Sequence, residues 1–220
     1  MSTVDGQIGI DESGKGDYFG PLVIAGVYVP HAQEAHLKAL GVRDSKTLSD
    51  AKATALAVQI RAQCPHAVVA IGPERYNALQ TSMKNLNRML AWGHARALEN
   101  LLEKVDCRRV VADQFGDERF LNNALMSKGR AVTLIQKPRA EEEVAVAAAS
   151  ILARAEFLRR LQELGTRYSV TLPKGASDAV IQAAKKFVEK YGGNELRQVA
   201  KLHFRTTESV LGNAIPGKRV

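Results

Sequence analysis

Short apolar runs rich in β-branched residues, bounded by glycine and proline, occupy the N-terminal part of the chain and predict strands. Residues 7–10 and 22–29 form two such runs, joined by a glycine-rich loop. A further apolar run at 67–71 follows a segment of helical character over 49–62, for which Ser49 is a good N-cap. This part of the chain is therefore expected to supply strands, with a helix before the last of them.

Farther along, apolar residues recur at the spacing typical of helices. The expected helices cover residues 74–80, 86–104, 142–164, 178–190 and 194–202. Strands are expected at 109–112 and at 131–135, the second stopped by Pro138. Strands that alternate with helices favour an α/β fold with a mixed sheet and helices on its faces. Nothing resembling a linker interrupts the pattern, so we expect one domain over 1–220 with C-terminal helices from about residue 166.

Composition narrows the class of protein only moderately. The chain has 220 residues, of which 45% are hydrophobic, and a formal net charge of +8. That length can bury a real core. The positive charge fits a polyanion such as nucleic acid as partner, because binding displaces counterions.

Targeting and redox signals are absent from the sequence pattern. Cys64 and Cys107 are too few for a disulfide framework and lack the spacing of metal ligands. The first residues do not read as a signal peptide, and the longest apolar run, 144–153, is about half a membrane span. We expect a monomeric cytoplasmic protein with reduced thiols and no membrane contact.

Carboxylates gather where the expected strands end. Asp11 and Glu12 close the first strand, Asp113 closes the strand at 109–112, and glutamates 141–143 follow the next one. If the first strand pairs with the second on one side and in parallel with 109–112 on the other, its carboxyl end is where connections diverge and ligands bind. Neighbouring strand residues face opposite ways. The first two acids are therefore expected to share a site only if the strand stops there and the following glycines turn the backbone.

These acids are suited to hard cations. Oxygen ligands without histidine or cysteine at fixed spacing favour Mg²⁺ or Mn²⁺ over zinc. Four carboxylates can hold two ions about 4 Å apart, one activating a water and one stabilising the leaving oxygen of a phosphoryl displacement. Each acid also has an ordinary alternative: Asp113 suits a strand-end turn, and glutamates 141–143 suit a helix N-terminus.

Several short motifs occur in order along the chain. They lie at 11–21 (DESGKGDYFGP), 43–48 (RDSKTL), 112–115 (ADQF), 139–141 (RAE), 145–154 (AVAAASILAR), 172–176 (LPKGA) and 201–204 (KLHF). Together they resemble ribonuclease HIII, of the type 2 ribonuclease H family, over residues 8–204.

The resemblance implies an RNase H-like fold with a mixed five-stranded sheet flanked by helices and a C-terminal helical extension. It implies metal-dependent cleavage of the RNA strand of RNA/DNA hybrids, leaving 5′-phosphate and 3′-hydroxyl ends, with Mg²⁺ or Mn²⁺ as cofactor. The catalytic and metal-binding set would be Asp11, Glu12, Asp113 and Glu141, with Glu142 as the alternative to Glu141. Substrate contacts are expected from Ser13, Gly14, Lys15, Gly16, Ser45, Lys46, Ser150 and Lys174.

Two features depart from the family pattern. Ribonuclease HIII proteins usually carry an N-terminal substrate-binding domain, which is expected to be absent because the first strand begins near Met1. The loop Gly14-Lys15-Gly16 stands where the sister enzyme ribonuclease HII has Gly-Arg-Gly. Glycine amides can reach a ribose 2′-hydroxyl, whereas lysine lacks the planar fork of arginine. Cleavage at ribonucleotides embedded in DNA is thus one alternative. A catalytically silent nucleic-acid-binding module is another, although such a protein gains nothing from acids placed near phosphates.

Four residues allow both a functional and an ordinary interpretation. Lys46 suits a phosphate contact or a capping turn, and the resemblance favours phosphate. Ser150 lies among alanines, where tight helix packing is the usual role. Arg154 suits the wet face of its helix, and Lys174 suits a solvated loop.

Overall fold

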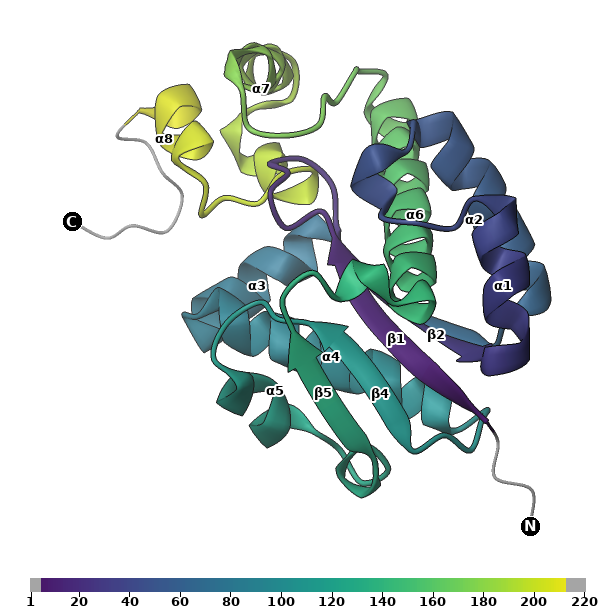
Figure 1. Cartoon of the computed structure of the whole chain (residues 1–220). Coiled ribbons are helices and arrows are strands. Elements are labelled where there is room, and N and C mark those ends of the chain that lie inside the picture. The colour runs from purple at the N-terminus through teal and green to yellow at the C-terminus, as the bar shows by residue number, and fades with distance from the viewer. Residues whose placement is uncertain (1–4, 213–220) are drawn as a thin grey trace. The chain divides into compact units, whose positions relative to one another are not determined.

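The computed structural model describes residues 5–212, which divide into two compact units. The first, here called the sheet unit, comprises residues up to Ser13, 23–69 and 85–156. The second, the helical unit, comprises 14–22, 70–84 and the chain from Phe157 onward. Figure 1 shows the elements of both. The single domain expected from the sequence stays a prediction.

The sheet unit is built on a mixed five-stranded sheet (Figure 1). Its strands are β1 (Gly6–Ser13), β2 (Leu22–Pro30), β3 (His66–Ile71), β4 (Arg109–Asp113) and β5 (Thr133–Lys137), in the spatial order β3-β2-β1-β4-β5. The central strand β1 is antiparallel to β2 and parallel to β4, and β4 is parallel to β5. This confirms the predicted sheet and the predicted partners of the first strand.

Helices and short 3-10 turns complete this unit. They are α1 (His31–Leu40), η1 (Ser45–Thr47), α2 (Asp50–Gln63), α4 (Leu86–Leu102), α5 (Glu118–Ala124), η2 (Gly129–Ala131), η3 (Ala140–Glu142) and the first half of α6 (Val144–Tyr168). Ser49 caps α2 as predicted, accepting the N–H of Lys52 at 3.2 Å. The expected strand at 131–135 begins later, at Thr133, because η2 occupies the preceding residues.

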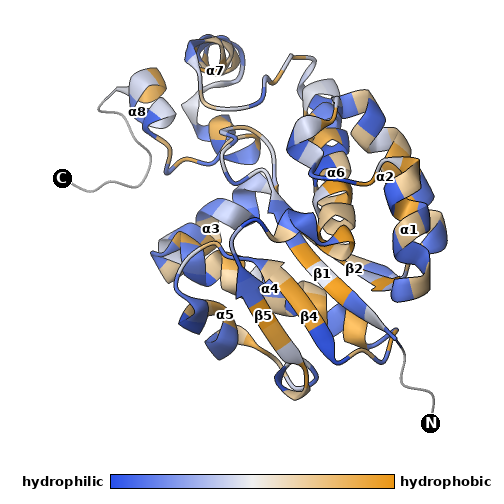
Figure 2. Ribbon diagram, viewed as in Figure 1, coloured by the Kyte–Doolittle hydropathy of each residue, from blue (hydrophilic) through white to orange (hydrophobic). Residues whose placement is uncertain are grey.

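Two helices cover opposite faces of the sheet. A Cβ on Gly9 of β1 would lie 2.1 Å from the backbone of Ala145 at the start of α6, so only glycine allows this approach. On the other face, a Cβ on Gly93 of α4 would lie 2.6 Å from the side chain of Ile24. Figure 2 shows apolar residues along β1, β4 and the helices around them. The alanine run of α6 is buried, which allows this helix to lie close to the strands.

The helical unit contains α3 (Pro73–Met83), α7 (Asp178–Tyr191), η4 (Gly193–Gln198) and α8 (Arg205–Leu211). The helix expected over 194–202 is wrong beyond Gln198. There the chain becomes extended: Phe19 and Ala200 form an antiparallel bridge, and Lys201 donates its N–H to the carbonyl of Tyr18 at 2.8 Å. Residues after Gln198 therefore bind the loop that follows β1.

Two general expectations can be compared with the described residues. Within residues 5–212, no helix is both long and apolar enough to span a bilayer. Cys64 and Cys107 are free and buried, which confirms that they form no disulfide with each other.

Lys201 is a fully buried lysine in the helical unit. Its Nζ donates to the carbonyl of Asp17 at 2.7 Å and lies 5.6 Å from the ring centroid of Tyr76. Burial lowers the pKa of Lys201 to about 7, and the nearby Asp17 only partly opposes this shift. The amine therefore holds the loop after β1 through backbone oxygens, at the cost of losing its charge readily.

Lys201 should make stability rise with pH. In the unfolded chain its amine keeps the ordinary pKa of 10.5, while in the native protein the pKa is about 7. Between these values the unfolded state binds the extra proton, so the free energy of unfolding increases with pH by up to about 1.4 kcal/mol per pH unit. Urea unfolding at pH 7.5 and 9.5 should show this rise in the parent and not in Lys201→Met. Equal pH responses of the two proteins would contradict it.

Candidate active site

The central strand does not stop at its acidic pair. Its antiparallel register with β2 continues through Asp11 and Glu12 to Ser13, so the condition that the strand has to end there is wrong. The two carboxylates leave opposite faces of the sheet, Asp11 toward Ser150 of α6 and Glu12 toward His94 of α4. Their charges still interact: Glu12 is the second largest cause, after burial, of the raised Asp11 pKa. The candidate site therefore includes carboxylates from both faces of β1 near its carboxyl end.

Asp11 sits in an environment that disfavours its charge. Burial of the carboxyl group raises its pKa to about 8, and the neighbouring charges of Glu12 and Asp113 add to the effect. Against this, Asp11 Oδ1 accepts the N–H of Glu12 at 2.8 Å, and the hydroxyl of Ser150 also bonds to the carboxylate. The position of the group is thus fixed by hydrogen bonds although its charge is unfavourable.

Asp113 is brought to the same place by β4. It is the last residue of that strand, and its Oδ1 accepts the N–H of Ala140 at 3.2 Å. Burial raises its pKa, and the charges of Glu141 and Glu12 raise it further. The structure thereby brings together the predicted acids from β1, β4 and the segment after β5.

The three glutamates before α6 have different surroundings. The charge of Glu141 helps to raise the pKa of Asp113, and Glu141 Oε1 is 3.9 Å from Lys46 Nζ. Glu143 is instead held by Lys137 Nζ at 2.7 Å and Gln7 Nε2 at 3.0 Å, which lowers its pKa. Glu142 is exposed. This arrangement favours Glu141 as the fourth acid.

His94 is a site residue that the sequence did not reveal. Its Nε2 lies 3.0 Å from Glu12 Oε2, and its ring packs 4.8 Å from that of Phe115. The side chain is fully buried, and its Nδ1 has no hydrogen-bond partner among the described residues. The available signal was a polar residue on the apolar face of α4, four positions after Leu90. His94 fixes the position of Glu12 from the α4 face.

Two of the three predicted substrate-binding hydroxyls, those of Ser45 and Ser150, are buried, whereas Ser13 is half-buried. Ser45 and Ser150 face each other with 2.5 Å between their Oγ atoms, and both side chains lie out of solvent. Lys46, by contrast, is 77% exposed beside Glu141. Ser150 bonds to the carboxylate of Asp11, and Ser45 joins the turn that carries Lys46 to Ser150. Their contact with substrate stays a prediction.

The glycine-rich loop after Ser13 is part of the helical unit. Gly14 has φ +87°, and a Cβ there would lie 2.2 Å from the carbonyl oxygen of Pro21, so its role is conformational. A Cβ on Gly16 would meet no heavy atom within 4 Å. The loop is joined to the segment after Lys174: Gly175 donates its N–H to Asp17 Oδ1 at 2.6 Å. Lys15 and Lys174 thus belong to two connected loops.

The donor set suits divalent cations. Within residues 5–212, no three histidine, cysteine or acidic side chains are gathered tightly enough to form a finished metal site. Neighbouring carboxylates nevertheless contribute, after burial, to the raised pKa values of Asp11 and Asp113. A cation relieves such repulsion, and all four groups offer hard oxygen ligands. The residues fit Mg²⁺ or Mn²⁺.

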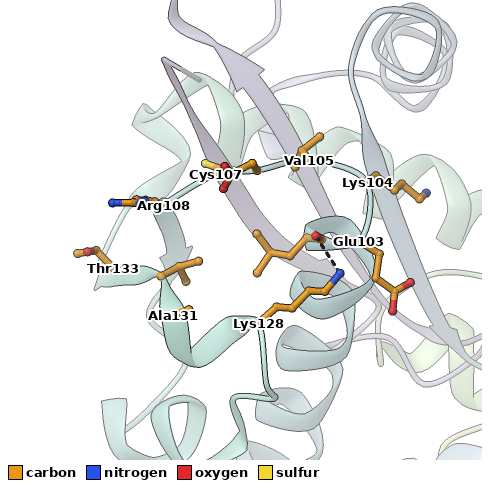
Figure 3. A pocket seen from close by; sticks show the side chains of 11 residues that line it. Glu103, Lys104, Val105, Cys107, Arg108, Lys128, Ala131 and Thr133 are labelled. Atoms are coloured by element: carbon orange, nitrogen blue, oxygen red, sulfur yellow. Dashed lines mark hydrogen bonds between the residues drawn. The ribbon is translucent and has the colours of Figure 1, made fainter. Parts of the chain in front are cut away.

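A pocket of about 780 Å³ lies elsewhere in the sheet unit (Figure 3). It is lined by 102–108, Lys128 and 131–133, the segments that lead into β4 and β5. Lys128 Nζ crosses it to the carbonyl of Leu102 at 3.3 Å. Because the acids occupy the carboxyl ends of the strands, this pocket at the opposite ends is not the candidate site.

Known proteins resemble the chain over nearly its whole length. The family model of ribonuclease HII matches residues 8–207. Ribonuclease HIII of Protochlamydia amoebophila is 49% identical over 206 residues, which cover 94% of this chain and 68% of the relative. The chain belongs to the ribonuclease HIII family.

Other members of the ribonuclease HIII family agree with this assignment. That of Chlamydia muridarum is 46% identical over 94% of this chain and 70% of its own length. The crystal structure of Bst-RNase HIII in complex with Mn²⁺ superimposes with a TM-score of 0.88 at 35% identity, over 96% of this chain and 70% of that chain. Membership confirms the predicted RNase H-like fold and the predicted ribonuclease H activity, cleavage of the RNA strand of RNA/DNA hybrids.

The raised pKa of Asp11 should be measurable without metal. Because burial and the neighbouring acids raise the native Asp11 pKa to about 8 from its ordinary value of 3.8, the parent in EDTA loses stability as pH rises between these values. Asp11→Asn lacks this loss, so its advantage in free energy of unfolding should grow from pH 5 to pH 7.5. Added Mg²⁺ should stabilise the parent more than the variant. Parallel pH curves for the two proteins would contradict this account.

Proposed function

We propose that this ribonuclease H cuts the RNA strand of hybrids with two divalent ions, Mg²⁺ or Mn²⁺, held by Asp11, Glu12, Asp113 and Glu141. The observation that supports it most is the gathering of carboxylates from separate segments: besides burial, the charges of Glu12 and Asp113 raise the pKa of Asp11, and those of Glu141 and Glu12 raise the pKa of Asp113. A protein that only bound nucleic acid would place lysine or arginine side chains there instead. The Mn²⁺ complex of Bst-RNase HIII supports a divalent ion.

The chain's own groups hold the reacting phosphodiester and the carboxylates in place. When bound, the ions would activate the attacking water and stabilise the leaving oxygen, giving 5′-phosphate and 3′-hydroxyl ends. Ser150 and the N–H of Glu12 orient Asp11, the N–H of Ala140 orients Asp113, and His94 orients Glu12. The exposed Lys46 ammonium beside Glu141 supplies positive charge for a backbone phosphate.

We further propose that the loop Gly14-Lys15-Gly16 recognises ribose. The open space around a Cβ on Gly16 supports close approach of a ligand to the backbone at this point, where amides can contact a 2′-hydroxyl. Lys15 and Lys174 add positive charge on the connected loops. Cleavage of RNA/DNA hybrids is proposed over cleavage at single embedded ribonucleotides, in keeping with the likeness to ribonuclease HIII proteins. A monomer is also proposed, and a cytoplasmic location, the latter in keeping with the free buried cysteines.

Asp113→Asn should abolish hybrid cleavage and leave the fold intact, because the amide keeps the shape and hydrogen bond of the side chain but loses its charge. Cleavage of a labelled hybrid at saturating Mg²⁺ measures this, with circular dichroism to confirm folding. Asp117→Asn is the matched control: it changes an exposed aspartate that caps α5. Near-normal turnover of Asp113→Asn would refute the assignment.

The glutamates can be separated by amide substitution. Glu141→Gln should lower cleavage at least a hundredfold, whereas Glu143→Gln should retain most of it, since Glu143 is paired with Lys137 and Gln7. Glu142→Gln should behave like Glu143→Gln. A larger loss in Glu142→Gln than in Glu141→Gln would transfer the role to Glu142.

The experiment that tests the function is a substrate panel. A uniform RNA/DNA hybrid and a DNA duplex with one ribonucleotide are incubated with Mg²⁺, Mn²⁺ or EDTA. Faster cleavage of the uniform hybrid, abolished by EDTA, is expected. Preference for the single ribonucleotide would favour the ribonuclease HII alternative, and binding without cleavage would favour the silent module.

A further inference from the structure

Arg154 is a charged residue of the sheet unit, and nothing described so far explains its contacts. It lies on α6, and only 20% of its side chain is exposed, so the expectation of a wet-face arginine is wrong. Its Nη1 donates to the carbonyl oxygen of Ser45, and its Nη2 and Nε donate to Asp50 Oδ1 at 2.6 and 3.2 Å. A guanidinium is thus committed to the segment around η1.

That segment is a single short turn. In η1, Asp44 accepts the N–H of Lys46 at 3.0 Å, and Thr47 Oγ1 returns to the carbonyl of Asp44 at 2.8 Å. Such 3-10 turns are too short to be stable alone. The turn is attached to α6 by the Ser45–Ser150 hydroxyl pair and by Arg154. Ser150 and Arg154 are four residues apart and share one face of the helix.

The turn carries Lys46 to the acids. The lysine is exposed, and its Nζ lies 3.9 Å from Glu141 Oε1. A lysine side chain is flexible and gives no planar fork to fix its own direction. The position of its ammonium group therefore depends on the backbone of the turn, to which Arg154 donates a hydrogen bond at the carbonyl of Ser45.

We infer that Arg154 is a positioning residue for substrate binding: it holds the Ser45–Thr47 turn against α6 so that Lys46 meets a backbone phosphate of the hybrid beside the carboxylates. The inference rests on the proposed function, which assigns Lys46 to phosphate. Arg154 itself touches no phosphate in this arrangement, since its guanidinium is used by Ser45 and Asp50. Its effect on the substrate passes through Lys46.

A double-mutant cycle tests this path. Lys46→Met, Arg154→Met and the double variant are compared with the parent in hybrid affinity, measured by fluorescence anisotropy in EDTA, and in kcat/KM. We expect each single change to weaken binding about tenfold and the double variant to bind no more weakly than Lys46→Met alone. Arg159→Met is the matched control, because Arg159 pairs with Glu163 on its own helix, and it should bind as the parent does.

The salt dependence separates positioning from direct contact. Each phosphate contact adds to the slope of log affinity against log salt. If Arg154 acts through Lys46, both single variants and the double variant should show the same shallower slope. Additive losses of affinity, or a slope that falls further in the double variant, would overturn the inference.

Unfolding and failure of the proposed function give distinct results. If thermal melting shows that Arg154→Met does not fold, the same cycle is run with Arg154→Lys, which can reach only one of the two partners and should still lose affinity only when Lys46 is present. If Lys46→Met binds and cuts like the parent, Lys46 has no phosphate role and the inference falls while hybrid cleavage stands. A parent that binds hybrid without cutting it refutes the proposed function alone, because the cycle can still be read in affinity.

Discussion

The burial and mutual repulsion of carboxylates near the carboxyl ends of two neighbouring parallel strands is the constraint on which the rest of the site depends. Asp11 and Asp113 both have raised pKa values because burial and like charges oppose their ionised forms. Groups so disposed stay in place only if the surrounding structure holds each of them separately. The protein does this with a different element for each acid: α6 for Asp11, α4 for Glu12, and the N–H of Ala140 for Asp113.

This division of labour follows from the register of β1. Because the strand continues to Ser13, its successive acids face opposite sides of the sheet, and each meets a buried polar residue of a helix. His94 and Ser150 are those residues, both buried. Each helix thus combines packing of the sheet with support of a carboxylate, so that the same contacts serve both the core and the proposed site.

The sheet could be predicted from the sequence because its strands are strongly apolar and bounded by glycine and proline. The helices α1 and α5 were missed since each buries a single leucine, Leu37 or Leu121, which leaves almost no periodicity to detect. The carboxylates that the structure brings together were predicted as strand-end residues and through the family resemblance. His94 and Arg154 were not, because their partners Glu12 and Ser45 lie 82 and 109 positions away, and no local pattern encodes such pairs.

Gly9 gives this architecture an unusual sensitivity. The backbone of α6 occupies the place where its Cβ would be, so even a methyl group would lift the helix from the strand. The same helix carries Ser150 to Asp11 and Arg154 to the Lys46 turn. A residue with no side chain and no charge therefore governs the spacing of the edge that carries the carboxylates. In a survey of inactive variants Gly9 would look like a catalytic position, although it contributes only the short distance between β1 and α6.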